Sequence, residues 1–219
     1  MITRTNEKII GVLFLLATAA FMIGSTLIDS NLAQSDYLSH IHSNRMQVFI
    51  SAFLELINSA AVVGIAMLLF PLLNHHNNSI ALGYLSSRII ESVLLIVGII
   101  SPLVLLTLSE DYIVSGGASN GYFTTIGNLI IRGQEMTFEL AMLALGLGSV
   151  MFCCLMYRKR LIPRLLSLLG IVGYIALMAS SCLTIIGFDP GFILFIPGGI
   201  FEVVFPIWLI AKGFCPKRD

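Results

Sequence analysis

Six long apolar stretches, separated by short polar segments, follow one another along the chain. About 20 consecutive apolar residues in a helix cross the hydrocarbon core of a bilayer, and each stretch reaches that length. The pattern therefore predicts an all-α integral membrane bundle of six transmembrane helices, forming one domain over residues 1–219. The predicted spans cover residues 9–28, 46–72, 80–108, 134–156, 161–186 and 190–212.

The segment 122–132 lies directly before the fourth predicted span. Joined to that span it would form a helix of about 35 residues, or roughly 52 Å, which is too long for one crossing. We therefore expect a short interfacial or half-inserted helix there, with a break near Gly133. The first apolar stretch follows Arg4 and Lys8, as in a signal peptide. Its length of about 20 residues exceeds the usual 7–15, and it has no clean cleavage site, so we interpret it as the first span.

Composition supports a membrane protein, since 57% of residues are hydrophobic and 11% are charged. A soluble domain usually has about 25% charged residues. The 12 basic and 12 acidic residues give no net charge, which argues against a nucleic-acid partner and leaves the lipid bilayer as the expected one. Nine basic residues fall on one side, predicting a cytoplasmic N-terminus and C-terminus. They are Arg4, Lys8, Arg158, Lys159, Arg160, Arg164, Lys212, Lys217 and Arg218.

Cysteine and histidine positions do not predict a disulfide, a cofactor or a metal centre. The four cysteines, Cys153, Cys154, Cys182 and Cys215, have no CxxC or Cys/His partner at zinc spacing. No GxSxG, HExxH or P-loop pattern occurs, and no catalytic residue is predicted. Metal binding by Asp36, His40 and His42, in the loop 29–45, is an alternative to their being solvated. Gly146 and Gly148 are interpreted as sites of close helix packing.

Ionisable and polar residues inside the predicted spans are the candidates for function. A charged side chain at the centre of a membrane helix costs about 2.5–3.5 kcal/mol on insertion scales, so such residues face the bundle interior. Helical spacing places several of them on shared faces, and counting along the helices puts Glu55, Arg88, Glu91 and Glu202 near the bilayer midplane. The predicted binding residues are Glu55, Arg88, Glu91 and Glu202, with Asn58, Ser87 and Glu139 as secondary members.

The balance of charge in this set suggests what it binds. Arg88 can pair with Glu91, three residues away, but three carboxylates cannot all be neutralised by one guanidinium. Glu55 and Glu202 must then be protonated, hold a cation, or contact water. The Pro197-Gly198-Gly199 run beside Glu202 can unwind its helix, as at many transporter sites, although such runs are also common in ordinary membrane helices.

Three hypotheses follow from these residues. The first is a small transporter-like or ligand-binding protein whose midplane site takes a proton, a cation or a small molecule. The second is a non-transporting accessory or interaction protein whose buried polar network only holds the helices together. The third is an intramembrane enzyme, against which the lack of a nucleophile or metal set argues.

Three short motifs resemble those of the bacterial membrane family described as domain of unknown function 4386. They are Arg88-Ile89-Ile90-Glu91, the segment 157–170 (YRKRLIPRLLSLLG), and the segment 197–213 (PGGIFEVVFPIWLIAKG). The resemblance covers nearly the whole chain, and Glu55 stands where that family tends to carry an acidic residue. An aromatic-Arg pair typical of the second span's start is replaced by Val48-Phe49. The resemblance implies a multi-pass protein of the bacterial plasma (inner) membrane and no particular activity.

Overall fold

The computed structural model describes residues 3–116, 121–188 and 190–214, and this part of the chain is helical, without β-strands. Six segments are long and apolar enough to cross a membrane, which confirms the predicted all-α six-helix bundle. The elements are α1 (Arg4–Leu32), α2 (Tyr37–Ser43), α3 (Arg45–His76), α4 (Asn78–Val114), α5 (Gly121–Lys159), α6 (Arg164–Ile185), the 3₁₀ helix η1 (Phe192–Phe195) and α7 (Ile196–Ala211).

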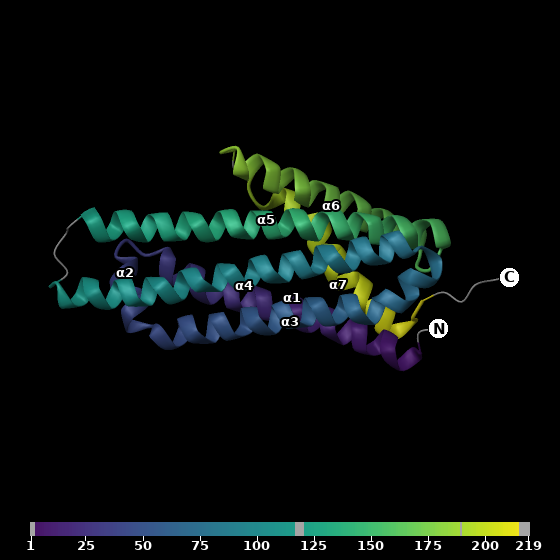
Figure 1. Ribbon diagram of the computed structural model, residues 1–219, viewed down its shortest axis with the longest axis horizontal. Coiled ribbons are helices and arrows are strands. Elements are labelled where there is room, and N and C mark those ends of the chain that lie inside the picture. The colour runs from purple at the N-terminus through teal and green to yellow at the C-terminus, as the bar shows by residue number, and fades with distance from the viewer. Residues whose placement is uncertain (1–2, 117–120, 189, 215–219) are drawn as a thin grey trace.

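The six long helices close into a ring. Each packs against its successor, from α1 to α3, α4, α5, α6 and α7, and α7 returns to contact α1. The start of α1 and the end of α7 lie at one end of the bundle, which we call the terminal end; the opposite end, where α2 packs, is the α2 end (Figure 1). This arrangement leaves an interior into which side chains of non-adjacent helices converge.

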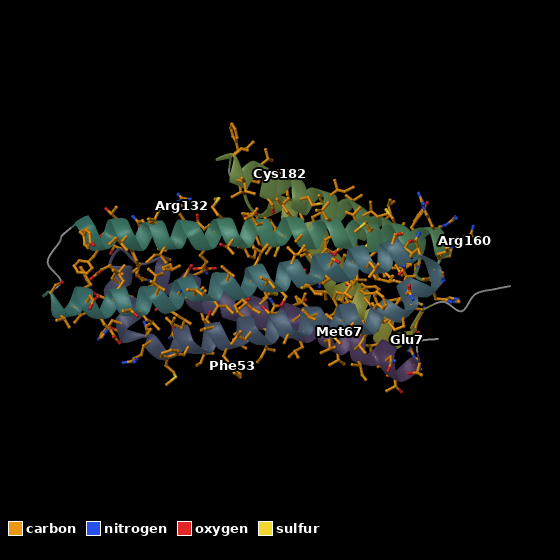
Figure 2. The ribbon with its side chains drawn as sticks, in the orientation of Figure 1. Glu7, Phe53, Met67, Arg132, Arg160 and Cys182 are labelled. Carbon is orange, nitrogen blue, oxygen red and sulfur yellow. The ribbon has the colours of Figure 1, made fainter. Side chains whose placement is uncertain are left out.

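The outer surface of the ring is apolar. Figure 2 shows Phe53, Met67 and Cys182 pointing away from the bundle, and the first two are more than 60% exposed at 64% and 62%. A soluble monomer rarely exposes so continuous an apolar surface, whereas lipid tails cover it without penalty. The chain is therefore a multi-pass membrane protein.

Helix α5 differs from the prediction of a break near Gly133. It runs unbroken from Gly121 to Lys159, so the segment 122–132 is not a separate interfacial helix. A single glycine lowers helix stability by only about 1 kcal/mol. The ion pair of Arg132 with Glu135 (2.8 Å) bridges the position, since residues three apart share a helix face. At 39 residues α5 is about 58 Å long, so it extends beyond the hydrocarbon core.

A second, smaller core lies at the α2 end. Tyr37, Leu38 and Ile41 of α2 are buried against Ile28 of α1, Val48 of α3, and Leu105 and Leu106 of α4. The sequence had predicted a loop over 29–45, yet it holds the end of α1 and all of α2. The protruding parts of the long helices are thus packed rather than solvated on all sides.

The sequence suggested that the Pro197-Gly198-Gly199 run unwinds its helix, but the structure shows no such unwinding. The run occupies the first turn of α7, where proline is tolerated because the first backbone N–H groups have no helical partner. Gly198 serves packing instead: a Cβ added at Gly173 of α6 would meet the backbone of Gly198 at 2.6 Å. Gly146 and Gly148 also pack closely, against Met178 and Ser87, which confirms their predicted role.

Candidate binding site inside the helix ring

A buried ion pair forms the centre of the site. Arg88 Nη1 donates to Glu91 Oε2 over 2.9 Å, and the two side chains are 5% and 4% exposed. Their spacing of three residues on α4 places them on one helix face. The Arg88 guanidinium also lies over the Tyr84 ring, 5.9 Å from its centroid. Its buried Nε has no hydrogen-bond partner among the described residues, so the pair does not use every donor of the arginine.

A second carboxylate, Glu202 of α7, faces the same interior. The Tyr174 hydroxyl of α6 donates to Glu202 Oε1 over 3.2 Å. The ion pairs found among the described residues do not include Glu202. A phenol hydroxyl supplies a hydrogen bond but no positive charge. Two carboxylates, Glu91 and Glu202, therefore lie near one guanidinium, and of these two Glu202 has no ion-pair partner among the described residues.

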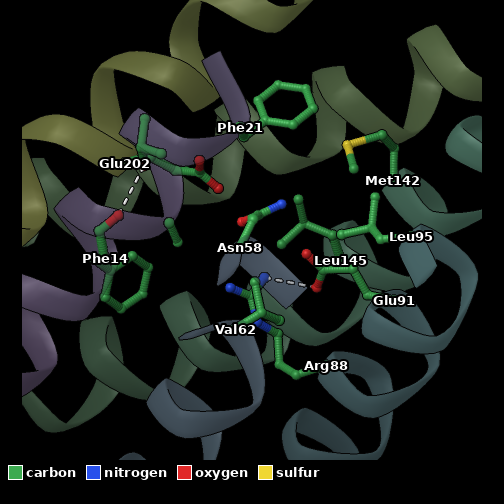
Figure 3. Close-up of a pocket in the computed structure, with 12 residues that line it drawn as sticks. Phe14, Phe21, Asn58, Val62, Arg88, Glu91, Leu95, Met142, Leu145 and Glu202 are labelled. Atoms are coloured by element: carbon green, nitrogen blue, oxygen red, sulfur yellow. Dashed lines mark hydrogen bonds and ion pairs between the residues drawn. The ribbon is translucent and has the colours of Figure 1, made fainter. Parts of the chain in front are cut away.

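Arg88, Glu91 and Glu202 line a partly open cavity of about 80 Å³. Figure 3 shows Asn58, Arg88, Glu91 and Glu202 around it, together with apolar side chains of α1, α4 and α5. A water molecule occupies about 30 Å³ of liquid, so two or three waters or a small ion fit. Sites for drug-sized molecules measure about 300–1,000 Å³, so the cavity is too small for such a ligand. The lining residues are Phe14, Ala17, Thr18, Phe21, Asn58, Val62, Arg88, Glu91, Leu95, Met142, Leu145 and Glu202.

Glu55 lies beside the cavity rather than in its wall. Asn58 lines the cavity and its Nδ2 donates to Glu55 Oε2 over 3.4 Å. The bond from Ser92 Oγ to the Ser59 carbonyl (3.0 Å) sets the antiparallel alignment of α3 and α4. The paired residues Ser59 and Ser92 thus lie at one level of the bundle. Glu55 lies four residues from Ser59 along α3, toward the α2 end.

Arg88 lies four residues from Ser92 along α4, toward the terminal end. At 1.5 Å per residue, the backbones of Glu55 and Arg88 are therefore offset along the bundle by about 12 Å. The sequence count had placed both at one depth, because it measured each from the nearer end of a predicted span and the real α3 and α4 are longer.

The two remaining candidates do not line the cavity. Ser87 packs against Gly148 of α5 and donates to the Tyr84 carbonyl (2.8 Å), so it belongs to the α4–α5 contact. Glu139 is buried on α5, about one turn from the cavity residue Met142 toward the α2 end. Its Oε2 has no hydrogen-bond partner among the described residues.

Several residues of the site were missed from the sequence. Thr18 and its apolar neighbours on α1 form one wall, and Tyr174 on α6 holds Glu202. Thr18 and Tyr174 are polar side chains well inside predicted spans, and that position was the available signal. Ionisable residues alone had been considered strong candidates, so these neutral groups were passed over.

The histidine alternative receives no support from the geometry. Within the described residues, no group of three His, Cys, Asp or Glu side chains is placed to hold a metal ion. Asp36 instead accepts a hydrogen bond from Ser39 Oγ (2.6 Å). The free cysteines Cys153, Cys154 and Cys182 are described, while Cys215 lies outside the described residues.

Comparison with known proteins identifies the family. Residues 9–213 match the family described as a domain of unknown function (DUF4386). The chain belongs to the DUF4386 family. No curated protein and no solved structure matched it. The match includes every residue of the cavity wall, so the site lies within the DUF4386 domain itself.

Proposed function

We propose that this DUF4386 protein is a small transporter-like or binding protein whose central cavity takes a proton or a small cation at Glu202. The observation that carries the proposal is the pairing pattern: Glu91 is paired with Arg88, while Glu202 accepts only the Tyr174 hydroxyl. An ionised carboxylate without a cation is unfavourable in a low-dielectric interior, so binding a proton or a cation stabilises it. We place the protein in the bacterial plasma membrane.

The size of the cavity supports a small, positively charged ligand. Two or three water-sized positions of about 30 Å³ each account for its volume of about 80 Å³. The Thr18 hydroxyl and the Asn58 side chain supply further oxygen atoms on the wall. Hard cations are bound by carboxylate, carbonyl, hydroxyl and water oxygens, which is the donor set present. Arg88 is paired with Glu91, so the cavity keeps one negative charge in excess when Glu202 is ionised.

Cation-dependent thermal stability of the purified protein tests this proposal. Li⁺, Na⁺ and K⁺ chlorides are added at constant ionic strength against choline chloride, at pH 6 and pH 8. A ligand that binds only the folded state stabilises it by about 2.7 kcal/mol at a hundred times its Kd. We expect one of the small cations to raise Tm, and more at pH 8 than at pH 6, because protons compete for the same carboxylate.

Two variants give the test its specificity. Glu202→Gln keeps an oxygen acceptor for Tyr174 but removes the charge, so it should fold with a stability within about 1 kcal/mol of wild type and lose the cation response. Glu7→Gln is the matched control: Glu7 is also largely buried, but it pairs with Arg4 at the terminal end, outside the cavity. It should retain the response.

Proton flux separates a proton site from a cation site. In liposomes containing the pH dye pyranine, a proton site predicts faster collapse of an imposed pH gradient with wild type than with Glu202→Gln. Absence of both the cation response and the flux in wild type would contradict the proposal. So would an unchanged response in Glu202→Gln.

A purely structural role is the second candidate. The 2.9 Å pair of Arg88 with Glu91 is complete in itself, and this favours a network that only joins helices. Under that function Glu202→Gln would change stability without any cation or proton response to lose.

A further inference from the structure

Polar side chains follow the contact between α1 and α3 from the α2 end toward the cavity. Asn31 of α1 donates to Gln47 Oε1 (3.0 Å) and accepts from Asn44 Nδ2 (3.0 Å). One turn further in, Ser51 Oγ donates to the Gly24 carbonyl over 2.8 Å. Asn31 and Ser51 are both 3% exposed, so these groups lie inside the helix contact and not on its outer surface.

The same contact continues to the cavity through a carboxylate. Glu55 lies against Gly24, since a Cβ added at that glycine would be 3.5 Å from Glu55 Oε1. Asn58, three residues further along α3, touches Glu55 and lines the cavity. We name this set of residues, Asn31, Gln47, Ser51, Glu55 and Asn58, the α1–α3 seam. Apolar side chains would pack such a helix contact at least as well, and buried polar groups are usually matched by partners or water.

Aromatic rings fill the interior on the other side of the cavity. Tyr84 stacks on Phe152 (5.2 Å between centroids), Phe152 meets Phe205 (5.6 Å), and Phe205 stacks on Phe201 (5.2 Å). Phe14 of the cavity wall contacts Phe205 at 5.3 Å. Tyr84, Phe152 and Phe205 each lie on the terminal-end side of the cavity residues on their own helices.

These rings are tightly enclosed: the four rings Tyr84, Phe152, Phe201 and Phe205 are at most 2% exposed. We name them the aromatic cluster. Close-packed interiors of this kind have few voids that could hold water. The stacked pair of Phe21 with Phe138 (5.7 Å) lies toward the α2 end, between α1 and α5. On that side the hydrogen-bonding groups therefore follow the α1–α3 contact alone, whereas packed rings fill the terminal side.

We infer that the cavity exchanges water, and with it a proton or small cation, only with the compartment at the α2 end, through the α1–α3 seam. Glu55 is the first carboxylate on that path, and the aromatic cluster closes the terminal side. The inference rests on the proposed function for the identity of what moves, but the water path stands or falls by itself. In a transporter, this arrangement is the state open to one side only.

Hydroxyl-radical footprinting of the purified protein in lipid nanodiscs tests the path. Radicals generated from water by a synchrotron X-ray pulse oxidise methionines that have water beside them, and mass spectrometry measures the rate. Met142 lines the cavity, and Met156 lies on the same helix beyond the aromatic cluster; both are buried, at 8% and 0% exposed. We expect Met142 to be oxidised at least about tenfold faster than Met156, since only the cavity holds water.

Two matched glycine variants locate the route. Gly24→Val inserts a side chain into the seam beside Ser51 and Glu55, while Gly64→Val inserts one between α3 and Leu13 of α1, on the terminal side of the cavity. Gly24→Val should reduce oxidation of Met142 several-fold and Gly64→Val should leave it unchanged. Glu55→Leu provides a second test, because it leaves Gly24 and the close approach of α1 to α3 unchanged. It should also reduce the rate at which Met142 is oxidised.

Each outcome decides the matter. Equal, slow oxidation of Met142 and Met156 would show a dry cavity and overturn the inference. Equal, fast oxidation of the two would show water at the terminal side, and loss of labelling in Gly64→Val alone would place the route there. If Met142 and Met156 are oxidised as expected but the protein shows no cation-dependent Tm and no proton flux, the water path stands and only the proposed function is refuted.

Discussion

Replacing Arg88 with methionine tests the reasoning about charge most directly. The side chains of Arg88 and Glu91 are 5% and 4% exposed, so the substitution leaves a carboxylate without its counterion in a desolvated interior. Breaking a buried pair in this way typically costs about 3–5 kcal/mol. Glu202 faces the same cavity and adds repulsion. We therefore expect Arg88→Met to lower the free energy of unfolding by about 3–5 kcal/mol at pH 8.

The loss should shrink as the pH falls, because protonation removes the negative charges that Arg88 no longer balances. It should also shrink when the partner is removed: Arg88→Met with Glu91→Leu replaces both charges by apolar groups, and such replacements are often neutral. Unfolding in mixed micelles with increasing dodecyl sulfate, followed by circular dichroism, measures these differences.

The exposed pair of Arg132 with Glu135 provides the control for this experiment. It has the same three-residue spacing and a similar distance, 2.8 Å, but its side chains are 76% and 47% exposed. Arg132→Met should cost about 0–1 kcal/mol. If Arg88→Met costs no more than Arg132→Met, or if the double replacement is as unstable as the sum of its single changes, the charges in the interior are not coupled as argued.

Two further predictions concern packing and topology. Gly173→Ala should destabilise the protein by at least about 2 kcal/mol, and more than Gly83→Ala in the same unfolding assay, because it meets the rigid backbone of Gly198 whereas Gly83 faces the flexible end of the Met151 side chain. A C-terminal green fluorescent protein fusion should fluoresce and an alkaline phosphatase fusion should be inactive, since the basic residues favour a cytoplasmic terminal end; the reverse result would refute the predicted orientation.

Hydropathy was sufficient to locate the six spans, because the bilayer requires a run of about 20 apolar residues wherever a helix crosses it. It did not give the full helix lengths. Once outside the hydrocarbon, a helix can continue through polar residues, as α5 does across Gly133. Packing against a neighbour decides that continuation, and tertiary context of this kind is absent from a local pattern. Helix α2 was missed for the same reason, although Tyr37, Leu38 and Ile41 have the spacing of one buried helix face.

The site was predictable in part. Helical spacing predicted the pairing of Arg88 with Glu91, and the rarity of charge in a span selected Glu202. Which helices meet is a property of the ring, so the sequence could not indicate that Tyr174 supports Glu202 or that Ser87 instead packs on Gly148. Depth was the weaker inference, because Glu55 and Arg88 were counted from opposite ends of the bundle, and two such counts meet at one level only if the helix lengths are known.

The arrangement of charge argues for function beyond scaffolding. A buried ion pair adds little net stability over apolar packing, so Arg88 with Glu91 is not needed to hold the ring closed. Glu202 adds a further carboxylate to the same cavity, with only a phenol hydroxyl as partner. For a scaffold this is an unfavourable choice, since glutamine would accept the same hydrogen bond without a charge to desolvate. A carboxylate differs from that glutamine in being able to take up and release a proton or a cation, and this is the property that the Glu202→Gln comparison isolates.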